Sequence, residues 1–261
     1  MSPDNSASPR QSPVTSPRIK VCGVRRPADV VMLAEEGVDT VGINLVSTSP
    51  RSVLLDEAQR LADLAHEVGL RVAIVVMNPT GEALRKILDT VPMDYIQMHG
   101  REPPELAQLC GATAIIKSVS WSGRGEERQL ARQWRDALAP LQEGTESGRA
   151  DAVPPVGSDA IVQEATTAHL QAMLVDAYAP VTGGGTGRTA RWDLLVPRPN
   201  EFRGIDLLLA GGLRPDNVAA AIREVHPDGV DTASGVEDSP GVKSRDQVRR
   251  FVAQVRRAWT S

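Results

Sequence analysis

Two groups that could handle protons stand where predicted strands end. Cys22 follows the apolar stretch IKV and precedes Gly23, at a turn where backbone dipoles and a nearby cation would favour a reactive thiolate. Asp176 follows MLV, so its carboxyl projects from the rim of an apolar strand, a setting that raises a carboxyl pKa and suits proton donation. Each residue also has a structural interpretation, Cys22 as a small core hydrophobe and Asp176 as a helix cap or ion-pair partner.

Three glycine-rich turns could hold an anion through successive backbone N–H groups. They are GGGTGRT (183–189), AGG (210–212) and ASG (233–235), each after a predicted strand. Any one of these glycines could instead serve only to make a tight turn. Because the three turns follow consecutive predicted strands, they favour a small phosphorylated substrate.

The elements that must position these groups are short Val- and Ile-rich runs alternating with helical patterns, which is typical of βαβ units. The predicted strands are 18–22, 40–45, 71–77, 94–98, 113–120, 172–177, 205–212 and 229–234, and the helix candidates are 27–37, 56–69, 81–90, 103–111, 126–141, 191–195, 214–225 and 245–258. Eight βα units with no segment left for a second domain predict an α/β fold, a single (β/α)8 TIM barrel. The alternative, a Rossmann-like open sheet, lacks a GxGxxG turn after the first strand.

Two segments fall outside this alternation. Residues 1–17 hold five Ser and four Pro with few apolar side chains, which predicts a disordered tail before a barrel domain at 18–261. Between the fifth and sixth strands, a charged helical stretch precedes a Gly-, Ser-, Pro- and Glu-rich segment at about 142–158. We predict that this segment is an exposed insertion.

Composition excludes several classes of protein. The chain carries 29 Lys and Arg against 33 Asp and Glu, a net charge of −4, which argues against a nucleic-acid partner or an anionic membrane surface. Cys22 and Cys110 lie far apart and outside any CxxC motif, so neither a disulfide framework nor a zinc site is predicted, and Cys110 is interpreted as core. No apolar run reaches about 18 residues and no secretory signal is recognisable, which predicts a cytoplasmic protein without a membrane span.

In a (β/α)8 barrel the catalytic groups lie at the carboxyl ends of the strands and in the loops that follow. Besides Cys22 and Asp176, the residues at these positions are Asn44, Gln97, His99, Lys117 and Asp231, with Arg51 in the loop after the second strand. The commonest phosphate site on this fold is formed by the loops after the seventh and eighth strands, where AGG and ASG stand.

These candidates belong to a series of motifs in a defined order. The motifs are KVCG (20–23), TSPR (48–51), QMHG (97–100), LLVDAY with Asp176, GGTGRT (184–189), LLLAGGLRPDNV (207–218) and GVDTASGVEDSPGVKS (229–244). Their order and spacing resemble the phosphoribosylanthranilate isomerase family of tryptophan biosynthesis, over about residues 18–258 without the region near 121–170.

The resemblance implies an isomerase that converts the aldose N-(5-phosphoribosyl)anthranilate into the 1-deoxyribulose ketose by an Amadori rearrangement, with neither metal nor organic cofactor. It implies that Cys22 is the general base, Asp176 the general acid and Arg51 the binder of the anthranilate carboxylate. The implied phosphate-binding residues are Gly184, Gly185, Thr186, Gly187, Gly211, Gly212, Ser234 and Gly235, and the implied pocket-lining residues are Asn44, Gln97, His99 and Asp231. The expected partner is a small phosphorylated substrate, bound by a monomer or homodimer.

The chain departs from the family pattern around the two ends of the substrate. Thr48 stands for the usual Lys, Ala190 and Arg191 for Phe and Asp, and Ala233 for Ser, whereas the catalytic pair is retained. These changes leave two alternatives open: the same chemistry on a modified N-glycoside in a secondary pathway, and a non-catalytic barrel that binds a sugar phosphate. The simultaneous presence of the acid–base pair and the TSPR arginine argues against the non-catalytic barrel.

Overall fold

The computed structural model describes residues 18–122, 125–138, 168–176 and 191–260. The predicted tail at 1–17, the predicted insertion at about 142–158 and the first glycine turn at 183–189 lie outside the described residues. Of the phosphate-binding residues expected there, Gly184, Gly185, Thr186 and Gly187 therefore have no described position.

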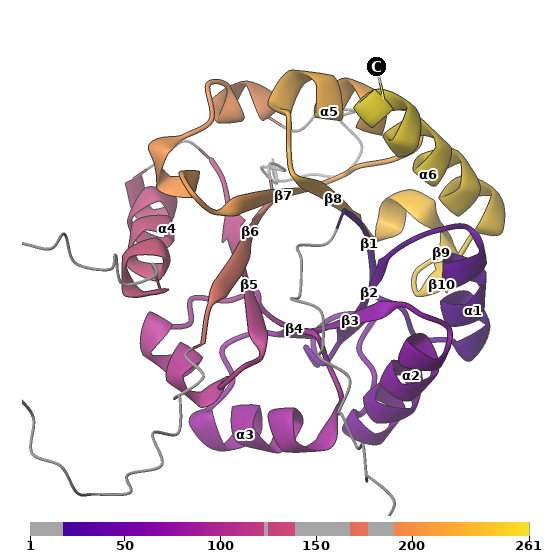
Figure 1. The fold of residues 1–261 in the computed structure, drawn as a ribbon. Helices are drawn as coiled ribbons and strands as arrows, with labels where there is room; N and C mark the ends of the chain where they lie inside the picture. The colour runs from indigo at the N-terminus through magenta and orange to yellow at the C-terminus, as the bar shows by residue number, and fades with distance from the viewer. Residues whose placement is uncertain (1–17, 123–124, 139–167, 177–190, 261) are drawn as a thin grey trace, which may run out of the picture.

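Eight parallel strands close into a barrel in chain order, which Figure 1 shows as a ring viewed along its axis. The strands are β1 Ile19–Cys22, β2 Thr40–Asn44, β3 Arg71–Val76, β4 Tyr95–Met98, β5 Ala114–Ser120, β6 Leu170–Asp176, β7 Asp206–Ala210 and β8 Gly229–Thr232. The ring closes because β1 pairs with β8, with Lys20 opposite Asp231. This closure confirms the predicted (β/α)8 barrel and excludes an open sheet, in which the first strand would not pair with the last.

Helices surround the ring of strands (Figure 1). They are α1 Pro27–Glu35, α2 Leu55–Glu67, α3 Gly81–Thr90, α4 Gly125–Leu138, α5 Val218–Val225 and α6 Arg245–Thr260, with the 3-10 turns η1 Pro104–Leu109, η2 Trp192–Leu195, η3 Asn200–Phe202 and η4 Ser234–Val236. A short hairpin, β9 Glu237–Ser239 and β10 Val242–Lys243, lies between β8 and α6. None of the helices in the described part of the chain combines the length and apolar character that crossing a membrane would need.

Two of the predicted helices are only 3-10 turns in the structure. The segment predicted as a helix at 103–111 forms η1, and the segment at 191–195 forms η2. Pro103 and Pro104 start η1, and Gly111 with φ of 55° ends the segment, so too few residues remain for a longer helix. Pro197 and Pro199 stand directly after η2 and oppose its extension in the same way.

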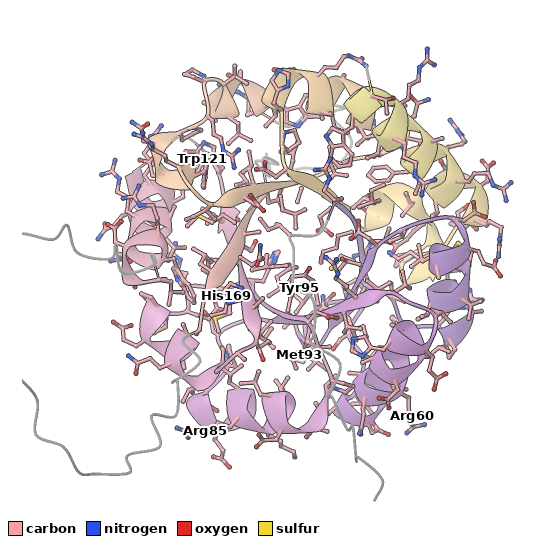
Figure 2. The ribbon with its side chains drawn as sticks, viewed as in Figure 1. Arg60, Arg85, Met93, Tyr95, Trp121 and His169 are labelled. Carbon is pink, nitrogen blue, oxygen red and sulfur yellow. The ribbon has the colours of Figure 1, made fainter. Side chains whose placement is uncertain are left out.

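The strands divide the apolar side chains between an inner and an outer core because successive residues of a strand point to opposite faces. The inner cluster consists of Ala73, Tyr95, Ala114, Ile116, Ala172, Leu174, Leu208 and Ala210. Their neighbours along the strands, such as Ile74, Ile96, Ile115 and Met173, join the outer cluster under the helices. Figure 2 shows Tyr95 toward the middle of the ring and Trp121 in the outer layer. Two members of the inner cluster, Leu174 and Ala210, lie near the carboxyl ends of their strands and line the cavity there.

Candidate active site

One cavity of about 390 Å³ lies at the carboxyl ends of the strands. Every described residue that the family resemblance implied for the site lines it, namely Cys22, Asn44, Arg51, Gln97, His99, Asp176, Gly211, Gly212, Asp231, Ser234 and Gly235. Residues that are as much as 213 positions apart in the chain, Cys22 and Gly235, thus meet at one opening. Strand-end position and the family resemblance together indicated these residues, whereas strand-end position alone also selected Lys117, which does not line the cavity.

Cys22 and Asp176 reach the cavity from different walls of the barrel. Cys22 is the last residue of β1 and Asp176 the last residue of β6, and β8 and β7 lie between these strands on the shorter way round the ring. The Asp176 backbone is fixed by the Trp121 N–H, which donates to the Asp176 carbonyl at 3.0 Å. The Gly23 N–H donates to the Gly42 carbonyl at 2.8 Å and fixes the turn after Cys22. A molecule in the cavity therefore has a thiol and a carboxyl on different sides.

The Cys22 thiol lies among opposing electrostatic influences. It is partly exposed, but desolvation by the surrounding protein raises its pKa. The neighbouring Lys20 ammonium lowers the pKa of the thiol, Asp231 raises it and Lys243 lowers it, with a net shift upward. The nearby cation that the sequence led us to expect is present, yet desolvation outweighs it.

Arg51 is held in place by an acidic residue of the β9–β10 hairpin. Its Nε and Nη2 donate to the two carboxylate oxygens of Glu237 at 2.8 and 2.7 Å. The same carboxylate accepts from the buried Lys243 Nζ at 2.8 Å, and Lys243 also donates to the Cys22 carbonyl at 2.7 Å. Burial alone would raise the pKa of Glu237, but hydrogen bonds from Arg51 and Lys243 bring it below its usual range. One edge of the guanidinium is thus bound to protein, and its Nη1 has no hydrogen-bond partner among the described residues.

Gly23 of the KVCG motif makes room for the Arg51 side chain. Its φ is 75°, in the left-handed region that favours glycine, and a Cβ at this position would overlap the Arg51 Cδ. Gly23 of the KVCG motif is therefore needed so that Arg51 of the TSPR motif can pack against it.

The two described glycine turns are tied to one another. Gly235 lies so close to the Leu213 carbonyl that a Cβ there would overlap the oxygen, and the Thr232 hydroxyl donates to this same carbonyl at 2.7 Å. Gly211 and Gly212 adopt φ of 92° and 66°. The turns after β7 and β8 form one wall of the cavity, as expected for a phosphate site on this fold.

Three further cavity residues differ in how their polar groups are used. Asn44 shapes its own loop, since its Nδ2 donates to the Ser49 hydroxyl at 3.1 Å and its Oδ1 accepts from the Val46 N–H at 2.8 Å. Gln97 Nε2 lies 3.2 Å from His99 Nδ1, whereas the buried Gln97 Oε1 has no partner among the described residues. Although His99 is exposed at the cavity, desolvation and then Lys20 lower the pKa of its ring, which favours neutral imidazole.

Lys117 does not belong to this site, and its prediction as a strand-end candidate is corrected. Successive residues of β5 point to opposite faces of the sheet, so Ile116 lies inside the barrel and Lys117 outside. There Lys117 Nζ contacts Glu102 Oε2 at 2.6 Å. Both side chains of this pair are fully buried. The structure also reveals three charged residues near the cavity that the sequence argument did not assign, Lys20, Glu237 and Lys243, although all three stand within the quoted motifs.

With this geometry established, comparison with known proteins identifies the family. The model of the N-(5'-phosphoribosyl)anthranilate isomerase family matches residues 19–153 and 151–254. The chain belongs to this family. It is therefore an isomerase, as the motifs indicated.

Named relatives support the assignment over nearly the full chain. N-(5'-phosphoribosyl)anthranilate isomerase of Pelobacter propionicus is 31% identical over 241 residues, covering 90% of this chain and 93% of the relative. The Myxococcus xanthus isomerase is 35% identical over 237 residues, covering 91% of this chain and 95% of the relative.

Solved structures of the family share the barrel. Phosphoribosyl anthranilate isomerase from Thermotoga maritima superposes with a TM-score of 0.69 at 27% identity, covering 92% of this chain and 99% of the other. A further structure of the family enzyme, in complex with reduced 1-(o-carboxyphenylamino)-1-deoxyribulose 5-phosphate, has a TM-score of 0.67 at 26% identity, with the same coverage. The name of that ligand contains a carboxyphenyl group, a deoxyribulose and a phosphate.

Proposed function

We propose that this chain catalyses the rearrangement of N-(5'-phosphoribosyl)anthranilate to 1-(2-carboxyphenylamino)-1-deoxyribulose 5-phosphate. The observation that carries the proposal is the meeting of Cys22, Asp176, Arg51 and the two glycine turns around one cavity, in a chain of this family. The proposal includes a small phosphorylated substrate, a monomer or homodimer, and a cytoplasmic location.

The reaction needs one acid and one base on different sides of the sugar. In the proposed first step the Asp176 carboxylic acid gives its proton to the ring oxygen, the C1′–O bond breaks, and the nitrogen lone pair forms a Schiff base. This cation acidifies the C2′ hydrogen, which the Cys22 thiolate removes while the C–H electron pair forms the enamine. The resulting enol then tautomerises to the ketose. Two groups with separated pKa values suit these two steps.

The substrate itself supplies the electron sink in this scheme, so the proposed steps require neither metal nor organic cofactor. The Schiff-base nitrogen accepts the electron pair released at C2′ and returns it when C1′ is protonated. No proposed step therefore depends on a group outside the chain and its substrate.

The remaining residues hold the substrate ends. We assign the Nη1 side of Arg51 to the anthranilate carboxylate, because a planar guanidinium can bind one carboxylate on its side edge and another on its end edge. Gly211, Gly212, Ser234 and Gly235 would bind the phosphate together with Gly184, Gly185, Thr186 and Gly187. Asn44, Gln97, His99 and Asp231 would line the space for the pentose.

The loss of anthranilate fluorescence on turnover tests the proposal. Cys22→Ala and Asp176→Ala should each lower kcat by about 10² or more, with circular dichroism showing an intact fold. Retained activity in either variant would remove that residue from its role. The Cys110→Ala variant is the matched control for the thiol, because Cys110 is buried in the outer core and should be dispensable for turnover.

A second candidate, the same rearrangement on a modified N-glycoside, is favoured by two cavity residues. Thr48 and Ala233, which replace the usual Lys and Ser of the family pattern, both line the cavity. Folded protein that turns over a modified substrate and not the standard one would support this candidate. Binding of sugar phosphates with no turnover of any aminated ribose phosphate would instead support a non-catalytic barrel.

A further inference from the structure

A fully buried ammonium group lies directly beneath the Cys22 thiol. Lys20 stands two residues before Cys22 on β1, so both side chains point to the inside of the barrel. Lys20 Nζ donates to Asp231 Oδ1 at 2.9 Å, and its charge acts on the neighbouring Cys22 thiol. The side chain of Lys20 has no exposed surface, and that of Asp231 is 10% exposed.

Gly42 on the adjacent strand provides the space in which these groups meet. A Cβ at Gly42 would lie 2.7 Å from Cys22 Sγ, which is closer than side chains tolerate, and 3.0 Å from Lys20 Nζ, which is a very tight contact. The thiol and the ammonium therefore converge over the same backbone position. Any larger residue at 42 would push them apart.

The other charged groups that face Cys22 are already paired with one another. Lys243 and Arg51 both contact Glu237, and Lys243 binds the carbonyl rather than the thiol of Cys22. Lys20 is thus the cation that acts most strongly on Sγ, with Asp231 on its other side.

We propose that Lys20 is a positioning residue for the general base, in which its ammonium orients the Cys22 sulfur and stabilises the thiolate, while Asp231 holds the ammonium in place. The proposal rests on the proposed function insofar as Cys22 acts as the base. When the thiolate forms, the Lys20 ammonium interacts with two anions, the thiolate and Asp231. When Cys22 has taken the C2′ proton, the ammonium interacts with Asp231 alone. No atom of Lys20 needs to contact the substrate.

The electrostatic directions agree with this arrangement. Burial alone would lower the pKa of Lys20, but Asp231 and Cys22 raise it on balance, so the group stays an ammonium. Desolvation raises the pKa of Cys22, and Lys20 is the largest influence that lowers it. The thiolate would be harder to form without Lys20, and easier to form without Asp231.

The test measures the thiol directly, in the full chain with the Cys110→Ala background, through the pH dependence of iodoacetamide alkylation at Cys22. Lys20→Met should raise the apparent pKa of Cys22 by about 1–3 units, and Asp231→Asn should lower it by about 1 unit. Lys117→Met is the matched control, because it removes another buried ammonium, one that lies on the outer face of the barrel. This variant should leave the apparent pKa of Cys22 unchanged.

An unchanged or lowered Cys22 pKa in folded Lys20→Met would overturn the proposal, and so would an equal rise in Lys117→Met. If Lys20→Met does not fold, the sign of the shift in Asp231→Asn decides. The pH profile of kcat/KM should move with the alkylation pKa, with kcat near neutral pH falling about tenfold per unit and KM nearly constant. Alkylation shifts of the expected sign together with full activity of Cys22→Ala would leave the Lys20 contact standing and refute Cys22 as the base.

Discussion

Replacing Glu237 by Gln should lower both the stability of the barrel and the affinity for substrate, and the two losses can be measured separately. The carboxylate is 4% exposed and accepts two hydrogen bonds from Arg51 and one from Lys243. Glu237→Gln keeps the volume but removes the charge and one acceptor oxygen. Lys243, whose side chain is fully buried, then loses its only ion-pair partner among the described residues. Breaking a buried pair on one side costs about 3 kcal/mol of unfolding free energy.

The same substitution should weaken the binding of the substrate carboxylate. Arg51 loses the two-pronged contact that orients it, and we expect KM to rise about tenfold, which corresponds to about 1.4 kcal/mol. The change in kcat should be smaller, because the carboxylate is bound alike before and during the proton transfers. Steady-state kinetics by anthranilate fluorescence and urea unfolding by tryptophan fluorescence measure the two effects separately.

Glu102→Gln is the matched control, since Glu102 forms another buried pair with a lysine, on the outer face of the barrel. Its carboxylate contacts Lys117 at 2.6 Å with both side chains fully buried. We expect a similar loss of stability and a KM within about threefold of the unaltered protein. An unchanged KM in Glu237→Gln, or an equal rise in both variants, would refute the role of Glu237 in orienting Arg51.

Three further predictions address other parts of the molecule. Gly235→Ala forces a Cβ against the Leu213 carbonyl and should raise both KM and the inhibition constant of inorganic phosphate by about tenfold or more, whereas unchanged phosphate inhibition would place the phosphate elsewhere. Gln97→Leu removes the unpartnered buried Oε1 and should raise stability by about 1 kcal/mol while raising KM, as urea unfolding and kinetics can show; lost stability would mean that the amide is satisfied in the fold. His66 Nε2 lies 3.0 Å from Asp94 Oδ2, and this hydrogen bond raises the pKa of His66, so its stabilisation is present below the unfolded-state pKa and is lost as the pH rises through the folded-state pKa. In urea unfolding, His66→Gln should lower the stability by up to about 1 kcal/mol near pH 5.5 and by less near pH 8. An equal loss at both pH values would contradict this.

The alternation of apolar runs and helical patterns in the sequence was sufficient to predict the barrel. Strands recognised from Val- and Ile-rich runs agree with β1 to β8 to within a few residues, because buried parallel strands leave a strong local signal. The weak points were the segments at 103–111 and 191–195, where helical composition was present but prolines on one side limited the element to a 3-10 turn.

The sequence by itself also indicated most of the side chains at the catalytic end, since a residue that closes a strand of this fold lies near the rim, although Lys117 faces outward instead. It could not determine their partners. Lys20 and Asp231 are 211 residues apart and Arg51 and Glu237 are 186 apart, and nothing local records either contact. Only closure of the ring between β1 and β8, and the contact of the β9–β10 hairpin with Arg51, brought these charges together. Local patterns specify strands, turns and facing direction, whereas the pairing of buried charges depends on distances that exist only after the barrel has closed.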